Sequence, residues 1–191
     1  NAYYSIERYN KLKLNIQDII SDVGDYEVIN YLSGDQAIQQ AVVIGRKYLD
    51  INKIILVTEA YHGITFGLVR NNKIQYEGIE ILEFCLKDLA LSLDSYVGER
   101  TLLILEPLLF FAHMGEKGIE QMKKLCHEAK KKKCRIMFDE VRSGVFCTGT
   151  FLFAQQMSEI KPDIICFAKG LALGLATSVI ALEKNIFSDM D

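Results

Sequence analysis

The chain has 191 residues, half of them hydrophobic, which is enough for one domain with a substantial core and too few for two comfortable domains. Its net charge of −3 and isoelectric point of about 5.7 give no indication of nucleic-acid binding through bulk electrostatics. The five cysteines form an odd set without a C-x-x-C pair, a pattern typical of reduced thiols in a cytoplasmic protein rather than of a disulfide framework.

Metal binding and membrane insertion are not indicated by the sequence. The three histidines lack the spacing of zinc ligands, so we expect no metal site. The charge-free apolar stretch 171–182 is shorter than the about 20 residues that a membrane-spanning helix needs, and the N-terminus shows no secretory signal. We therefore expect a cytoplasmic protein that binds neither a membrane nor nucleic acid.

The first part of the chain predicts helix, strand and helix. Apolar residues recur at helical spacing between positions 6 and 20, so we expect one or two helices within an N-terminal helical segment, residues 1–30. Residues 26–32 are rich in β-branched and aromatic side chains and predict a short strand. Ser33-Gly34-Asp35-Gln36 then has the S-x-x-Q form of a capping box ahead of a helical apolar pattern. A helix that starts in this way is a natural anion site, although an ordinary capped helix is the alternative.

Strands and helices alternate through the rest of the chain. Near-continuous apolar runs predict strands at 53–58, 101–106, 136–141, 163–168 and 178–182. Helices are predicted at 81–93, 118–133 and 151–160, and loops at 67–81 and 108–114. This alternation predicts an α/β fold with a mostly parallel central sheet and helices on both of its faces.

Side chains that can carry chemistry follow four of the predicted strands. Asp139 ends one buried run and Lys169 follows another, while Glu106 ends a third and Tyr61-His62 come just after a fourth. In open α/β sheets, ligands bind at the carboxyl ends of the strands, so these groups can face a single ligand. Each also has a structural alternative as a surface, loop or packing residue. The roles of Arg142, Ser143 and Thr148 stay equally open between structure and function.

The order and spacing of these pieces resembles the large domain of fold-type I pyridoxal-phosphate enzymes, specifically the class III (ω-)aminotransferase family. The resembling pieces are Ser33-Gly34-Asp35-Gln36-Ala37, Tyr61-His62-Gly63, Glu106-Pro107, Phe138-Asp139-Glu140-Val141-Arg142-Ser143-Gly144, Thr148-Gly149, Pro162-Asp163-Ile164 and Ala168-Lys169-Gly170. Any one piece is a weak signal, whereas the whole series in order is a strong one. The resemblance implies a single pyridoxal-phosphate-binding large domain over residues 31–191.

The resemblance implies a transaminase that moves an amino group between an amino donor and an oxo acid or aldehyde, with pyridoxal 5′-phosphate as its cofactor. Lys169 would form a Schiff base with the cofactor and carry the proton, and Asp139 would face the pyridine nitrogen. The remaining contacts that it implies are Tyr61 and Val141 on the two ring faces, the backbone of Gly34 and Asp35 at the phosphate, His62 behind Asp139, Glu106 near the ring and Arg142 near the phenolic oxygen.

Three features depart from that family. Asp35 places a carboxylate at the helix start where a small or hydroxyl residue is usual, and residues 108–114 are apolar where the family loop is glycine-rich. Arg142 replaces a commonly neutral amide. The family's N-terminal part and C-terminal small domain are also missing, so a catalytically incomplete fragment or remnant is the first alternative. Another class III activity, such as an aminomutase or the transamination of biotin precursors, is the second. The resemblance also implies a homodimer.

Overall fold

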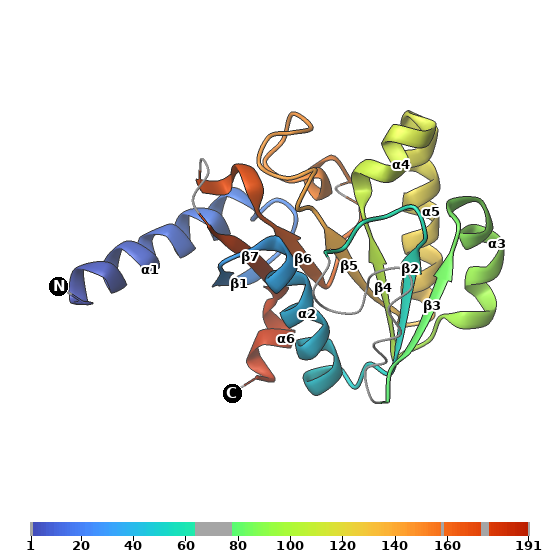
Figure 1. Cartoon of the computed structure of the whole chain (residues 1–191), viewed down its shortest axis with the longest axis horizontal. Helices are drawn as coiled ribbons and strands as arrows, with labels where there is room; N and C mark the ends of the chain where they lie inside the picture. The colour runs from blue at the N-terminus through green and yellow to red at the C-terminus, as the bar shows by residue number, and fades with distance from the viewer. Residues whose placement is uncertain (1, 64–77, 158, 173–175, 191) are drawn as a thin grey trace.

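A central sheet organises the computed structural model, which describes residues 2–63, 78–157, 159–172 and 176–190 (Figure 1). The described residues form seven strands in the order β1-β7-β6-β5-β4-β2-β3. Their bounds are β1 (Tyr26–Tyr31), β2 (Lys53–Val57), β3 (Glu80–Phe84), β4 (Thr101–Leu105), β5 (Arg135–Asp139), β6 (Ile164–Phe167) and β7 (Ser178–Glu183). Strands β3, β2, β4, β5 and β6 are parallel, while β7 runs antiparallel to both of its neighbours. The predicted α/β architecture with a mostly parallel sheet is confirmed.

Helices cover both faces of the sheet, as Figure 1 shows. They are α1 (Ala2–Ile19), α2 (Gly34–Tyr48), α3 (Leu86–Tyr96), α4 (Pro107–Met114), α5 (Glu116–Lys131) and α6 (Lys184–Ser188), with 3₁₀ helices η1 (Phe153–Met157) and η2 (Lys169–Ala172). Successive strand residues alternate between two cores: Leu103 and Phe138 pack into the one that contains α5, and Leu102 and Met137 into the one beneath α2. Because both faces are buried, the strands are apolar at nearly every position.

Two sequence-based assignments are wrong. Residues 81–93, predicted as one helix, form β3 followed by α3; β3 is an edge strand that is only half-buried, so its apolar residues are spaced ambiguously. Residues 108–114, predicted as a loop, form α4. Pro107 suits the first turn of a helix, Phe110 is buried, and the N–H of Gly115 bonds the carbonyl of Phe111 to close the last turn.

The other elements differ from prediction mainly at their ends. The helix predicted at 118–133 begins two residues earlier as α5, and the one predicted at 151–160 is only the 3₁₀ helix η1. The helical pattern near the N-terminus forms the single helix α1. Most of the loop predicted at 67–81 lies outside the described residues.

The carboxyl ends of β1, β2, β4, β5 and β6 lie at one edge of the sheet. Strand β1 runs parallel to β6 because both pair antiparallel with β7, which lies between them. The turn from β1 into α2 is therefore close to the residues that follow β5 and β6. The hydroxyl of Ser178 donates a hydrogen bond of 2.6 Å to the carbonyl of Ser33 and joins the start of β7 to that turn.

Neither a membrane span nor a metal site is found in the described residues. None of the described helices is both long and apolar enough to cross a membrane. The same residues contain no group of three or more His, Cys, Asp or Glu side chains that could hold a metal ion.

Candidate functional site

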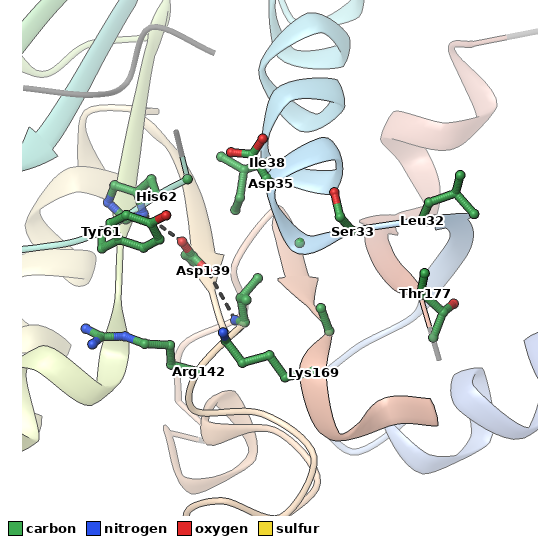
Figure 2. Close-up of a pocket in the computed structure, with 15 residues that line it drawn as sticks. Leu32, Ser33, Asp35, Ile38, Tyr61, His62, Asp139, Arg142, Lys169 and Thr177 are labelled. Atoms are coloured by element: carbon green, nitrogen blue, oxygen red, sulfur yellow. Dashed lines mark hydrogen bonds and ion pairs between the residues drawn. The ribbon is translucent and has the colours of Figure 1, made fainter. Parts of the chain in front are cut away.

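A cavity of about 340 Å³ opens at the carboxyl edge of the sheet. Figure 2 shows its lining side chains, which come from the α2 turn, the segment after β2, the ends of β5 and β6, and the start of β7. They are Leu32, Ser33, Gly34, Asp35, Ile38, Tyr61, His62, Gly63, Asp139, Val141, Arg142, Ala168, Lys169, Ala176 and Thr177. Apart from Glu106, every residue that the sequence assigned to the cofactor lines this one cavity.

The first turn of α2 forms one side of the cavity. Ser33 is the N-cap, and its hydroxyl accepts a hydrogen bond of 3.1 Å from the N–H of Gln36, as the capping box predicts. The Gln36 side chain reaches back to the N–H of Leu32, one residue earlier than expected. The positive end of the α2 dipole therefore faces the cavity beside Gly34.

Glycine is required at position 34 by a close approach of two segments. A Cβ atom there would lie 2.8 Å from both γ-carbons of Val141, a distance that real Cβ contacts essentially never show. Because Val141 follows β5, the absence of a side chain at Gly34 is what lets the start of α2 lie against the end of that strand. The capping-box pattern singled out Gly34 in the sequence, but only the fold shows that Val141 is the residue packed against it.

The carboxylate of Asp35 does not face the centre of the cavity. Its Oδ2 accepts a 3.4 Å hydrogen bond from the side chain of Gln39, one helical turn along α2. Its Oδ1 lies so close to Gly63 that a Cβ atom there would overlap it. In Figure 2 this carboxylate points away from Lys169. The repulsion expected between Asp35 and a bound anion is reduced by this orientation.

Asp139 and His62 form a buried pair in the cavity wall. Nδ1 of His62 lies 2.7 Å from Oδ2 of Asp139, and Oδ1 of Asp139 accepts a 3.1 Å hydrogen bond from the N–H of Val141. The other ring nitrogen of His62, Nε2, is buried and has no hydrogen-bond partner among the described residues. The carboxylate of Asp139 is therefore held in place from two sides.

Lys169 follows β6 in a strained backbone conformation. Its φ angle of 47° lies in the left-handed region, which costs a non-glycine residue roughly 1–2 kcal/mol. The turn continues into η2, and Gly170 packs against Val145, where a Cβ atom would meet the valine side chain at 3.3 Å. The side chain of Lys169 extends into the cavity below Asp139 (Figure 2). Strain of this kind in a cavity-lining residue is typical of functional sites.

Glu106 lies behind the cavity wall and contacts two lining residues. It is 1% exposed, and its Oε2 accepts a 3.3 Å hydrogen bond from the N–H of Tyr61. Its Oε1 forms an ion pair with Nε of Arg142. Hydrogen bonding to Glu106, and the charges of Glu106 and Asp139, raise the pKa of Arg142 above its usual value. Glu106 thus fixes both Tyr61 and Arg142.

Sequence reasoning assigned no role to Glu140, although its place beside Asp139 was a signal. It is fully buried and accepts hydrogen bonds from the hydroxyl of Ser143 (2.9 Å) and from the N–H groups of Phe153 and Ala154 (2.6 Å each). Burial raises the pKa of Glu140 to about 7, against the opposing effect of these hydrogen bonds. Glu140 and Ser143 thereby anchor the loop that follows β5.

The structure shows where two threonines lie relative to the cavity. Thr148 does not line the cavity, and its hydroxyl is buried without a hydrogen-bond partner in the described part of the chain. Thr177 does line the cavity, but it was not predicted because no motif surrounds it.

Comparison with known proteins relates this chain to aminotransferases. Residues 101–191 match the family model described as aminotransferase class-III. This chain is a relative of the class-III aminotransferases. It is 30% identical over 165 residues to a [LysW]-aminoadipate semialdehyde/glutamate semialdehyde transaminase of Sulfolobus acidocaldarius, covering 83% of this chain and 42% of that protein. It is 29% identical over 174 residues to an acetylornithine aminotransferase of Oceanobacillus iheyensis, covering 81% and 42%.

Solved structures of aminotransferases share the fold. A Bacillus anthracis aminotransferase superposes with a TM-score of 0.74 at 21% identity, covering 93% of this chain and 47% of that one. An ω-transaminase from Pseudomonas jessenii in complex with PMP gives a TM-score of 0.71 at 21% identity, covering 94% and 47%. The fold is that of the fold-type I aminotransferases. The chain spans about half the length of the curated relatives it matches.

Proposed function

We propose that this chain is the cofactor-binding half of a pyridoxal-phosphate-dependent transaminase, which transfers an amino group between an amino donor and an oxo acid or aldehyde. One observation supports it above the others: Lys169, the Asp139–His62 pair and the start of α2 line the same cavity. The family match and the names of the relatives support the same reaction class.

The cavity residues fit pyridoxal 5′-phosphate by the chemistry of their donors. A volume of about 340 Å³ is within the range of small-ligand sites. The cofactor has an aldehyde, a basic ring nitrogen and a phosphate, and the cavity offers an amine, a buried carboxylate and a helix N-terminus in return. When bound, the cofactor supplies an electron sink for the carbon that carries the amino group.

Each residue has a role that follows from its position. Lys169 would hold the cofactor aldehyde through its side-chain amine, and the same amine would accept and return a proton at the carbon that reacts. Asp139 would keep a proton on the ring nitrogen, because an opposite charge close by favours the charged form. His62 orients that carboxylate, and Tyr61 and Val141, which also line the cavity, would hold the ring.

The phosphate belongs at the start of α2 in this proposal. The hydroxyl of Ser33 is hydrogen-bonded to the N–H of Gln36, so the preceding backbone groups of Gly34 and Asp35 are the ones that face the anion. Glu106 supports the ring side of the site through Tyr61 and Arg142.

The test is to mix the purified chain with pyridoxal phosphate and to record the visible absorbance band of a lysine-bound cofactor. Borohydride should lock the cofactor onto the protein, and peptide mapping should find it on Lys169. Lys169→Ala should abolish the band, whereas Lys161→Ala, at an exposed lysine, should leave it unchanged. No band, or a band that survives in Lys169→Ala, would overturn the assignment.

The activity and assembly of the whole protein belong to the same proposal. We infer a cytoplasmic homodimer that binds no nucleic acid, with a domain boundary near residue 30; the five unpaired cysteines support the compartment. A cofactor band without turnover of a panel of amines would favour the catalytically incomplete alternative. A monodisperse monomer in light scattering would count against the dimer.

A further inference from the structure

Arg142 is a partly exposed cation with a fixed orientation. Its side chain is 46% exposed, yet its Nε is bonded to Glu106, whose side chain is 1% exposed. Glu106 is itself held by the N–H of Tyr61. Ordering a long arginine side chain is normally unfavourable in entropy, so this anchoring prepares the guanidinium for a ligand in advance.

The guanidinium of Arg142 has N–H donors that are not bonded to any described residue. Arginine carries five N–H donors, and among the described residues only Glu106 bonds this group, through Nε. The planar fork formed by the two terminal nitrogens matches the two oxygens of a carboxylate. Arg142 lines the same cavity as Lys169. A carboxylate that reaches this fork can therefore bind Arg142 without displacing Glu106.

Two groups that can attract an anion lie at the cavity, the N-terminus of α2 and the guanidinium of Arg142. Figure 2 shows Ser33 and Thr177 on one side of Asp139 and Lys169, and the guanidinium of Arg142 on the other. The proposed function places the phosphate at Ser33, so the Arg142 side is left for a second anion. An α-amino acid or an oxo acid carries such an anion close to the group that reacts at Lys169, whereas a simple amine does not.

We propose that Arg142 is the residue that binds the substrate carboxylate, so that this site selects amino acids and oxo acids over amines without a carboxylate. This inference rests on the proposed transaminase function. It assigns to Arg142 a specificity role that differs from a contact to the phenolic oxygen of the cofactor, and the two roles give different results in the experiment below.

The experiment uses protein that has been loaded with pyridoxal phosphate and reduced with borohydride, so that binding is measured without turnover. Glutarate, an unreactive dicarboxylate, is titrated by calorimetry into the wild type, Arg142→Gln and Arg142→Lys. A charge-assisted, forked contact is worth enough for Arg142→Gln to weaken glutarate binding about tenfold to a hundredfold. Arg142→Lys, which keeps the charge without the fork, should lie between the two.

Arg100→Gln is the matched control. Arg100 is also partly exposed, at 54%, and its Nε also bonds a carboxylate, that of Asp50, but it does not line the cavity. It should leave the glutarate affinity unchanged. Thermal unfolding of each variant checks that Glu106, left without its cation in Arg142→Gln, has not disrupted the fold.

The outcomes separate this inference from the proposed function. If the wild type binds glutarate but Arg142→Gln binds it equally well, Arg142 is not the carboxylate site. The same conclusion follows if Arg142→Gln changes only the pH titration of the visible band, recorded on loaded protein before reduction, as a contact to the phenolic oxygen would. If no cofactor band forms at all, the proposed function fails. The titration is then run on cofactor-free protein in phosphate buffer, which occupies the α2 side, and equal affinities there overturn the inference.

Discussion

Nδ1 of His62 lies 2.7 Å from Oδ2 of Asp139; His62 comes after strand β2 and Asp139 ends strand β5, and β4 separates these two strands in the sheet. Their contact therefore spans β4 at the carboxyl edge. The backbone of Val141 holds the second oxygen of Asp139. A carboxylate fixed in this way presents a constant position to a ligand in the cavity.

Replacing His62 by Phe should destabilise the fold, because it leaves the buried Asp139 with one hydrogen bond in place of two. We expect the free energy of unfolding to fall by about 2–3 kcal/mol, measured by urea denaturation. His113→Ala removes an exposed histidine and should change the stability little. Equal stabilities of His62→Phe and the wild type would show that the pair does not hold Asp139.

Gly34→Ala should disturb the junction between α2 and the end of β5. The added methyl group would lie 2.8 Å from both γ-carbons of Val141, a stiff β-branched side chain, so we expect a loss of about 1–3 kcal/mol in stability and weaker cofactor binding. Adding Val141→Ala should restore part of the stability by making room. Gly98→Ala, where a Cβ atom meets nothing within 4 Å, is the control. An unperturbed single variant would contradict the close approach.

Lys169 should show a conflict between stability and function. With φ at 47°, glycine suits this position better than alanine, so Lys169→Gly should be more stable than Lys169→Ala by about 1 kcal/mol in thermal or urea unfolding. Neither variant should hold the cofactor covalently. At Lys124, an exposed position within α5, the order should reverse because glycine weakens a helix. The same order at both positions would argue against strain at Lys169.

Glu140 should make stability depend on pH. Its pKa is raised by burial from 4.5 to about 7 in the folded state, so the folded protein binds an additional proton between these values. The contribution of Glu140 to the free energy of unfolding is present in full below pH 4.5, declines as the pH rises and is lost above about pH 7. Its size is roughly 3 kcal/mol, because each tenfold change in proton affinity is worth about 1.36 kcal/mol.

Urea denaturation of the wild type and Glu140→Gln at pH 5 and pH 8 measures this effect. The amide cannot titrate, so the difference in stability between the two proteins should change with pH in that direction. Glu120→Gln, at an exposed acid on α5, should run parallel to the wild type. A constant difference between the wild type and Glu140→Gln would assign the pH dependence to other groups.

The strands and the ends that carry Asp139 and Lys169 were predictable because burial on both faces leaves continuous apolar runs in the sequence. The capping box at Ser33 was likewise a local signal, since its donor and acceptor lie three residues apart. The edge strand β3 was not predicted, because a half-buried strand lacks such a run. The helix α4 was missed because its stability comes from the burial of residues such as Phe110 against distant parts of the core.

The hydrogen bonds behind the cavity could not be predicted from the sequence, because they join residues that are far apart in the chain. Glu106 was expected near the ring, but its bonds to Tyr61 and Arg142 join positions 45 and 36 residues apart. The role of Glu140 depends on the N–H groups of Phe153 and Ala154, which have no side-chain signature. Thr177 enters the cavity only because β7 is inserted between β1 and β6.

Strand β1 pairs along its whole length with β7, from Tyr26 opposite Glu183 to Tyr31 opposite Ser178. On the ribosome, the first strand is therefore made long before its only neighbour in the described sheet exists, and its edge stays open meanwhile. The turn at Ser33 and Gly34 reaches its position only after β7 has emerged. The ligand cavity consequently cannot form before β7 has been made, so a ligand that needs both sides of the cavity has to wait until synthesis has passed residue 183.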